Sequence, residues 1–233
     1  MCRPLAIPKA LGYTDAEDEV RPMSSEEKAR ILRAIWREKM HVEPRALELS
    51  PSHVSHSYEH VWQPAELLLV DLETLPAGLL RFWQECSRGH VVFTHQSSGY
   101  QPGPQPWRDG TLESVCYLSL TDLHEDKRTA MLALSNLLDH LLGSKAREGD
   151  PWLSDGSGAN AALREVGVRF AQVFALGYGQ AELGARTAHD YLARTFWMYL
   201  HEPDRLNALD PLVFKLYRNT LLREEFWQAR SPA

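Results

Sequence analysis

The sequence predicts an α+β fold in which a small mixed sheet is followed by a mainly helical C-terminal half. Short apolar runs at 67–72, 91–94 and 115–120 have the length and composition of buried strands. From Asp122 onward, apolar residues recur at intervals of three and four, which is the period of an amphipathic helix. Strands that come first and helices that follow are typical of α+β domains.

The N-terminal part is predicted to lie apart from the main domain. Residues 1–23 contain prolines and four nearby acidic residues, and we expect them to form a mobile arm. A helix is expected to begin at Ser24 or Ser25, because a serine hydroxyl caps a helix and acidic residues favour its first turn. We therefore divide the chain into an N-terminal arm with one amphipathic helix, 1–60, and a main domain, 61–233. The apolar face of the arm helix needs a partner and consists of Ile31, Leu32, Ile35 and Trp36.

The remaining elements follow from turn residues and periodicity. A helix is expected from Leu75 to Cys86, ended by Gly89. The segment 97–110, with three prolines and three glycines, is expected to be a long loop, and the segment 44–64 is turn-rich. The helices of the C-terminal half are expected at about 127–142, 159–176, 186–201 and 209–228.

Composition and charge exclude several classes of protein. The 233 residues carry a net charge of −6 and no basic stripe, so a general surface for nucleic acid or anionic membrane is not expected. No apolar stretch is long enough to span a bilayer, and the N-terminus lacks the long apolar segment of a signal peptide. We expect a cytoplasmic protein with reduced thiols rather than a disulfide framework, because only three cysteines occur and they are far apart: Cys2, Cys86 and Cys116.

Several short motifs occur in a recognisable order along the chain. Gly99-Tyr100 precedes the strand-like run 116–120, and the next helix ends in Leu138-Asp139-His140-Leu141-Leu142-Gly143. A later helix begins with Asp190-Tyr191-Leu192-Ala193-Arg194-Thr195-Phe196, followed by Tyr199 and Asp210-Pro211. Over residues 65–225 this pattern resembles the lethal-factor-like family of bacterial zincin metallopeptidases. In that family a Gly-x-Tyr loop leads to an edge strand, the next helix carries His-Glu-x-x-His, and a later helix supplies the third metal ligand.

The resemblance implies a zincin-like domain from which the catalytic residues are missing. It places the first metal histidine on Leu132, the general-base glutamate on Ala133 and the second histidine on Asn136. The third ligand falls on Asp190, and a further glutamate of the later helix becomes Arg194. A catalytic zinc needs about three protein ligands and an open water position, which leucine, alanine and a neutral amide do not supply. The arginine one turn after the remaining carboxylate favours an ion pair in the pocket instead of a metal.

Two other groups of side chains could bind a metal. His140, His189 and Asp190 could form a displaced zinc site, whereas the simpler interpretation makes Asp139 and His140 capping or solvent-facing groups near a helix end. Three further histidines, spaced three and four apart, could bind a transition metal if they lay on one helix. The surrounding prolines and serines favour irregular structure, in which the spacing has no significance; these residues are His53, His56 and His60.

Large apolar residues outside the expected core are candidates for binding a partner. Ile35 and Trp36 lie on the arm helix, and Trp107 lies in a segment rich in proline and glycine, so their burial requires a second surface. The alternative is that these side chains fold back onto their own domain.

The sequence therefore favours a non-catalytic, metallopeptidase-like protein, a pseudoenzyme that binds another protein or a peptide in a bacterial assembly or regulatory system. No cofactor is expected for such a protein. One alternative is a zinc-dependent peptidase with a displaced metal site. Another is a sensor of peptides or small molecules that uses the old substrate cleft, in which an extended peptide would pair along the segment 115–120. Fold alone does not decide among these functions.

Overall fold

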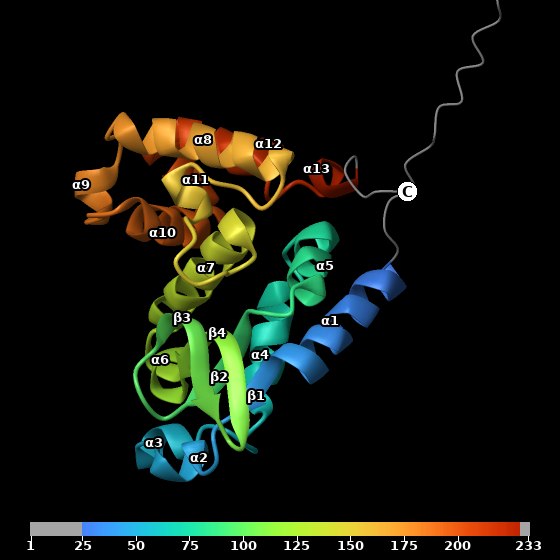
Figure 1. The fold of residues 1–233 in the computed structure, drawn as a ribbon. Coiled ribbons are helices and arrows are strands. Elements are labelled where there is room, and N and C mark those ends of the chain that lie inside the picture. Colours follow the sequence, from blue (N-terminus) through green and yellow to red (C-terminus); the bar gives the residue numbers. More distant parts are fainter. Residues whose placement is uncertain (1–24, 229–233) are drawn as a thin grey trace, which may run out of the picture.

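The structure is a computed structural model that describes residues 25–228. It is mixed α+β, with a four-stranded sheet in the N-terminal half and a helical C-terminal half, as Figure 1 shows. The predicted arm, 1–23, lies outside the described residues. No helix between residues 25 and 228 combines the length and apolar content needed to cross a bilayer.

The elements follow one another along the chain without long gaps. The strands are β1 (Met40–Val42), β2 (His90–Thr94), β3 (Gly99–Trp107) and β4 (Gly110–Ser119). The helices before the sheet is complete are α1 (Ser25–Lys39), α2 (Ala46–Leu49), α3 (Ser52–Ser55), α4 (Gln63–Leu72) and α5 (Ala77–Glu85). Those after it are α6 (Leu120–Glu125), α7 (Lys127–Ser144), the 3-10 turn η1 (Leu153–Asp155), α8 (Ala161–Ala175), α9 (Gln180–Leu183), α10 (Ala188–His201), α11 (Pro203–Leu209), α12 (Pro211–Asn219) and α13 (Glu224–Gln228).

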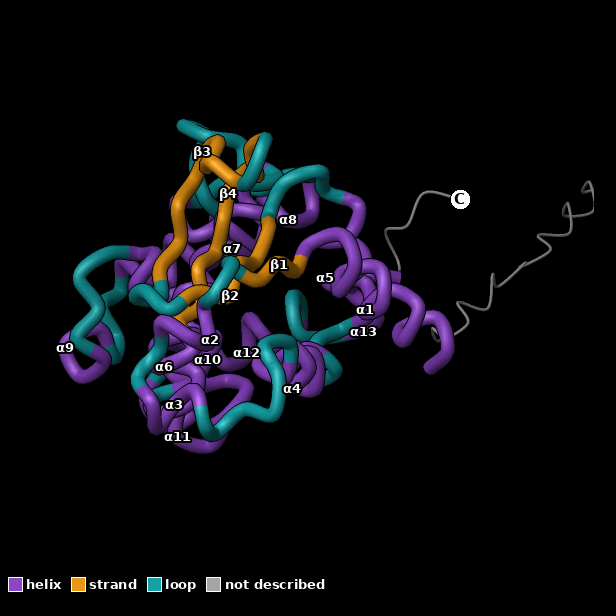
Figure 2. Tube along the Cα trace, turned by 90° about the horizontal axis from the view of Figure 1, so that it is seen from below, coloured by secondary structure: helices purple, strands orange, loops and turns teal. Residues whose placement is uncertain are grey.

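The sheet has the strand order β1-β2-β4-β3 and is mixed. β1, β2 and β4 are parallel, and β3 runs antiparallel to β4 at the edge of the sheet, as can be followed in Figure 2. Cys116 on β4 is opposite both Val91 on β2 and Tyr100 on β3, so β4 is paired along both sides. The side chains of β2 and the second half of β4 are almost completely buried, which agrees with the apolar runs predicted for them.

Polar caps explain where the helices of the C-terminal half begin. Asn160 accepts a hydrogen bond from the Leu163 N–H at the start of α8, and Thr187 accepts one from the Asp190 N–H at the start of α10. Asp210 ends α11 and caps α12, whose first residue, a proline, needs no hydrogen-bond partner for its nitrogen. The predicted continuous helix at 209–228 is therefore wrong, because these residues form the end of α11, then α12, a turn and α13.

The predicted strand at 67–72 is wrong, because this segment belongs to α4. Its side chains alternate between buried and exposed with a helical period: Leu68 and Leu72 are buried, whereas Leu67 and Val70 are exposed. A proline in the first turn, Pro64, is also typical of a helix. A short apolar run does not distinguish a buried strand from one face of a helix, so its composition was misleading.

The predicted loop at 97–110 is also wrong, because most of it is β3. Prolines are tolerated on an edge strand, where their missing N–H does not interrupt a sheet on both sides. The pairing with β4 is irregular between Gln101 and Pro104, where the register shifts. The prolines that favoured a loop are therefore accommodated by the edge position and by this irregularity.

The predicted boundary at residue 60 does not divide the structure. β1 lies N-terminal to that position and pairs with β2 in the same sheet. α1 packs against α5, and Ile35 and Val54 are fully buried in the same hydrophobic core as β2 and α7. Residues 25–60 are therefore part of the main domain.

We predict that Ile35→Ala lowers the free energy of unfolding by about 2–5 kcal/mol, because it leaves a cavity in a fully buried site. Urea unfolding followed by circular dichroism measures the change. Arg33→Ala on the exposed side of the same helix is the matched control, with an expected effect within about 0.5 kcal/mol. Equal, small effects of both variants would contradict the placement of α1 in the core.

Candidate functional site

The positions that the resemblance identifies as catalytic lie along α7 where it packs against α10. The two helices are antiparallel: the Arg128 guanidinium at the start of α7 lies 4.9 Å from the Trp197 ring, and Asp139 near its end lies 3.4 Å from the His189 ring. Figure 1 shows α7 running from the sheet into the helical half, with α10 beside it. This pair of helices therefore contains every position at which zinc ligands were expected.

On the α7 side of this interface, only one of the three predicted positions has a side-chain atom that could bind a metal, and it is a weak ligand. Leu132 is half-buried and Ala133 is buried, and neither can bind a metal or accept a proton. Asn136 is half-buried, and its side-chain oxygen, Oδ1, is buried without a hydrogen-bond partner among the described residues. An unpaired buried carbonyl of this kind costs about 1–3 kcal/mol.

The α10 side supplies one carboxylate. Asp190 lies in the first turn of α10, where its N–H donates to Thr187 Oγ1 at 3.1 Å. Arg194 is half-buried one turn later, and between residues 25 and 228 no ion pair joins it to Asp190. The expected ion pair in the pocket is therefore not formed. With one amide and one carboxylate at most, the residues present do not fit a catalytic zinc, which needs three ligands.

One turn beyond Asn136, six residues form a connected polar and aromatic cluster, which we call the Trp152 cluster. Its members come from β3, α7, the segment around η1, and α10: Tyr100, Asp139, His140, Trp152, Ser154 and His189. Gly143 permits this arrangement, because a Cβ at that position would lie 2.4 Å from backbone atoms of Trp152 and Leu153. The contacts of the cluster hold the segment after α7 against α7 and α10.

Both ring nitrogens of His140 are engaged. Nε2 lies 2.9 Å from the carbonyl oxygen of Arg147, which can only accept, so Nε2 carries the proton. Nδ1 is then the acceptor for the Tyr100 hydroxyl at 2.7 Å. Burial lowers the pKa of His140, which favours this neutral form. A metal could bind His140 only after displacing one of these two bonds.

His189 is linked to the fully buried Asp139 through Ser154. The Ser154 hydroxyl donates to Asp139 Oδ2 at 2.6 Å and therefore accepts from His189 Nδ1 at 2.8 Å. The hydrogen bond with Asp139 raises the pKa of His189. Burial raises the pKa of Asp139, while hydrogen bonds from His189 and Ser154 oppose that rise. The protonation of the two groups is therefore coupled, and His189 Nε2 lies 3.6 Å from a second carboxylate, Asp155.

The Trp152 ring contacts both histidine rings. It stacks on His140 with 4.9 Å between ring centroids and an interplanar angle of 14°, and its centroid is 4.2 Å from that of His189. His140 and His189 are also both hydrogen-bonded within the cluster, so the displaced site with Asp190 is not assembled. Among residues 25–228 no group of three His, Cys, Asp or Glu side chains has a metal-binding arrangement.

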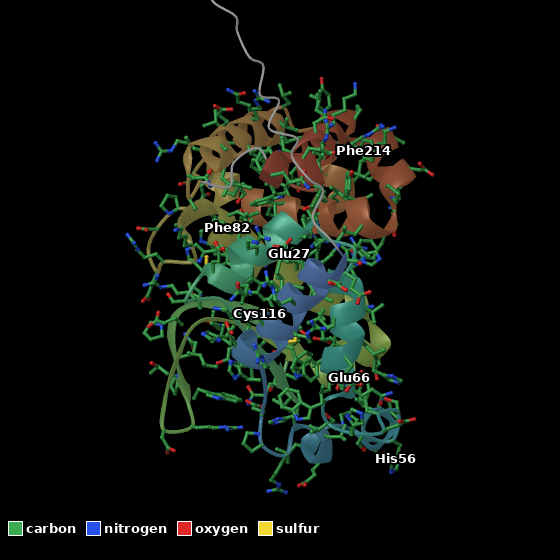
Figure 3. All side chains as sticks on the ribbon, turned by 90° about the vertical axis from the view of Figure 1, so that its right-hand side faces the viewer. Glu27, His56, Glu66, Phe82, Cys116 and Phe214 are labelled. Atoms are coloured by element: carbon green, nitrogen blue, oxygen red, sulfur yellow. The ribbon has the colours of Figure 1, made fainter. Side chains whose placement is uncertain are left out.

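The three histidines in the turn-rich segment do not converge either. His53 lies on the short helix α3 and its Nε2 is 2.6 Å from Glu125, whereas His60 Nε2 is 3.8 Å from Glu66. His56 is exposed at the end of α3, on the opposite side of the molecule from Phe214 in Figure 3. Because His53 and His60 have separate acidic neighbours, the three histidines do not share the helix face that the metal hypothesis requires.

The predicted partner-binding residues have contacts within their own chain. Ile35 was expected to contact a partner but is fully buried in the core, so that expectation is wrong. Trp36 is half-buried with its ring centroid 5.3 Å from that of Trp62. Trp107, also half-buried, lies 5.5 Å from the His41 ring and 5.5 Å from the Arg108 guanidinium. Both tryptophans thus follow the alternative in which the rings fold back onto the domain.

Exposed apolar side chains occur instead on the outer side of α4, which sequence reasoning missed. Leu67 and Val70 are 51% and 62% exposed, and Trp62 at the start of the helix is 38% exposed. We call these three residues the α4 face. Beside it lies a cavity of about 180 Å³, lined by Tyr58, Pro64, Leu68, Leu123 and Lys127 among others. Spacing of three between Leu67 and Val70 would have indicated this face, had the segment been treated as a helix.

The strand segment 115–120 cannot accept an extended peptide as was expected. β4, which contains most of it, is hydrogen-bonded to β2 on one side and to β3 on the other. The outer strands of the sheet are β1, which is only three residues long, and β3, which contains Pro102, Pro104 and Pro106. Prolines have no N–H to donate to an added strand, so the β3 edge is protected against pairing, and β1 is too short to pair with a long extended peptide.

Comparisons with known proteins add no family. The chain matches no protein-family model, and a search of curated proteins finds no significantly similar sequence.

We predict that His189→Gln destabilises the protein more at pH 6 than at pH 8. The pKa of His189 is raised above its ordinary value of 6.5, so the stabilisation is complete below about pH 6.5 and is lost as the pH rises through the folded-state pKa. The ring is 34% exposed, so we expect a pH-dependent part of only about 0.5 kcal/mol. Urea unfolding at both pH values measures it. His56→Gln is the exposed control, and a larger loss at pH 8 than at pH 6 would contradict the sign.

Proposed function

We propose that this protein is a non-catalytic relative of the lethal-factor-like zincin metallopeptidases and acts in the bacterial cytoplasm by binding another protein or a peptide. One observation carries the proposal: aliphatic and amide side chains occupy the α7 positions at which two histidines and a glutamate would be required, namely Leu132, Ala133 and Asn136. The relation to zincins is supported by the order of elements along the chain, in which β4, α7 and α10 follow one another; β4, the run matched to the family's edge strand, lies inside the sheet and does not add to this support.

The chemistry of peptide hydrolysis is absent at this site. A metallopeptidase needs a Lewis-acidic ion to activate water and a carboxylate to accept its proton. Ala133 offers no proton acceptor, and Asp190 is the only carboxylate at the ligand positions. A single carboxylate does not hold zinc in an open, tetrahedral site.

The geometry does not favour the two alternatives. A displaced peptidase site would require His140 and His189 to bind one ion, but each ring is held in the Trp152 cluster. A sensor that captures an extended peptide would require a long free strand edge rich in N–H groups, but β3 contains prolines and β1 has only three residues. Binding through the outer faces of helices remains the function that agrees with both observations.

The α4 face supports a protein partner. Large apolar side chains that are exposed together are costly in water and are typical of contact surfaces. The apolar cavity next to Leu67 offers a recess into which a partner side chain could insert.

We predict that restoring both histidines, Leu132→His with Asn136→His, creates a zinc site with Asp190. Residues four apart share a helix face, and the resemblance places the third ligand on Asp190 of the adjacent α10. Elemental analysis after purification without chelator should give about one zinc per chain, whereas the native chain should contain none in stoichiometric amount. Adding Asp190→Asn should weaken zinc binding more than tenfold.

The native chain and Leu132→His alone are the controls for this experiment. A folded double variant that binds no zinc would contradict the zincin relation. Stoichiometric zinc in the native protein, lost on His140→Ala, would instead establish the displaced site.

We predict that Leu67→Ser with Val70→Ser abolishes co-purification of a partner with the tagged protein from cells that naturally produce it. Both residues are exposed, so stability should change by less than about 1 kcal/mol. Quantitative mass spectrometry of the co-purified proteins measures the loss. Arg33→Ser with Arg37→Ser on exposed positions of α1 is the matched control. The same set of proteins with both variants would exclude the α4 face as the contact.

A further inference from the structure

A groove runs between α8 and α12 on the outside of the helical half. The two helices are antiparallel, because Leu176 and Leu212 line one end of the groove and Arg169 and Asn219 line the other. Figure 1 shows α8 and α12 side by side, away from the sheet. The groove encloses about 360 Å³, and we call it the α8–α12 groove.

The floor of the groove is apolar and partly open to solvent. Val173 and Leu216 lie along it, and Leu176 and Leu212 at one end are 58% and 41% exposed. Covering a concave apolar surface of this kind with a complementary apolar segment is favourable, because it removes apolar area from water. The floor therefore indicates an occupant with apolar side chains.

The other end of the groove is basic. Lys215 and Asn219 also line a second hollow of about 550 Å³, together with Arg218 and Arg223. No carboxylate lines either hollow, and among the described residues only Arg223 of these cations has an ion pair, with Glu225 at 2.9 Å. Arg218 suits the C-terminal end of α12, but this does not account for the other cations. In a protein of net charge −6, such a cluster indicates an acidic occupant.

The chain itself contains a segment with this pattern. Four apolar residues come first, and an acidic run follows them: Leu5, Ile7, Leu11 and Tyr13, then Asp15, Glu17, Asp18 and Glu19. The order agrees with the groove, which has an apolar end and a basic end. The segment also stands close to the described part of the chain, because its last acidic residue is six positions before Ser25.

Contacts through α5 and α13 connect the start of α1 with the basic end of the groove. Glu27 in the first turn of α1 forms an ion pair with Arg81 on α5, and the Trp227 ring on α13 lies 6.0 Å from the ring of the next residue, Phe82. Figure 2 shows α1, α5 and α13 together, and Figure 3 shows Glu27 close to Phe82. α13 directly follows Arg223. Six residues span up to about 20 Å, which is the reach from Ser25 to the last acidic residue of the run.

We propose that residues 5–19 of this chain occupy the α8–α12 groove, with the carboxylates of 15–19 on the cations and the apolar residues of 5–13 on the floor. Because the segment is attached to α1, its effective concentration at the groove is high, in the millimolar range for a short linker. A protein with a similar acidic and apolar segment would have to displace it. This proposal does not depend on the zincin relation, so the two can fail separately.

Zero-length carbodiimide cross-linking of the full chain tests the proposal, because it joins a carboxylate to an amine only when they are in contact. We expect Lys215 to be joined to the acidic run at least ten times more efficiently than the exposed Lys145 at the C-terminal end of α7. Peptide mapping by mass spectrometry gives both yields. Mixing ¹⁴N- and ¹⁵N-labelled protein shows whether the linked peptides come from one chain.

Two charge-reversal variants provide the matched comparison. Arg218→Glu with Arg223→Glu should lower the Lys215 yield at least tenfold, whereas Arg164→Glu with Arg205→Glu, which changes the net charge equally outside the groove, should leave it unchanged. Three results would overturn the proposal: no link from Lys215 to 15–19, a yield insensitive to the groove variant, or links only between differently labelled chains. The last result would assign the groove to a second copy.

Discussion

The burial of α7 on almost every side is the constraint on which the rest of the structure depends. This helix packs on β3 and β4, on α10 and on the turn η1, and most of its residues are inaccessible to solvent. A helix enclosed in this way must pair each polar side chain internally. Ser135 bonds to the Met131 carbonyl, and Asp139 and His140 bond within the Trp152 cluster. The cluster is therefore a consequence of where α7 lies.

Asn136 is the exception along this helix, and its position is informative. It is one turn from the fully paired Asp139, yet its side-chain oxygen has no partner within residues 25–228. The polar side chains of α7 thus have hydrogen-bond partners where the helix packs against η1. The one that lacks a partner lies where the resemblance places a metal ligand. A well-packed interface that served stability alone would favour an apolar residue at this position.

The sequence was sufficient wherever a local rule decides the outcome. The period of three and four placed the beginnings of α7, α8 and α10 to within about two residues, and the structure shows caps at Asn160 and Thr187 where α8 and α10 begin. The apolar run of α4 could not be assigned locally, because its length and composition suit either element. The Trp152 cluster was beyond sequence reasoning for another reason. Tyr100, His140 and His189 are 40 and 49 positions apart along the chain, and no spacing pattern relates them before the fold is known.

The closed interior of the domain and its exposed helical faces are physically related. An active metallopeptidase must keep its cleft open to substrate, which limits how tightly the catalytic helix can be covered. Leu132 and Ala133 stand where the resemblance places a metal histidine and the general-base glutamate, and both side chains allow the α7–α10 interface to be packed, with Trp152 and its neighbours at one end. The binding that we propose therefore uses surfaces outside the α7–α10 interface. The apolar side chains left exposed on α4, α8 and α12 lie on such surfaces, which is why we propose that binding involves the outer helices.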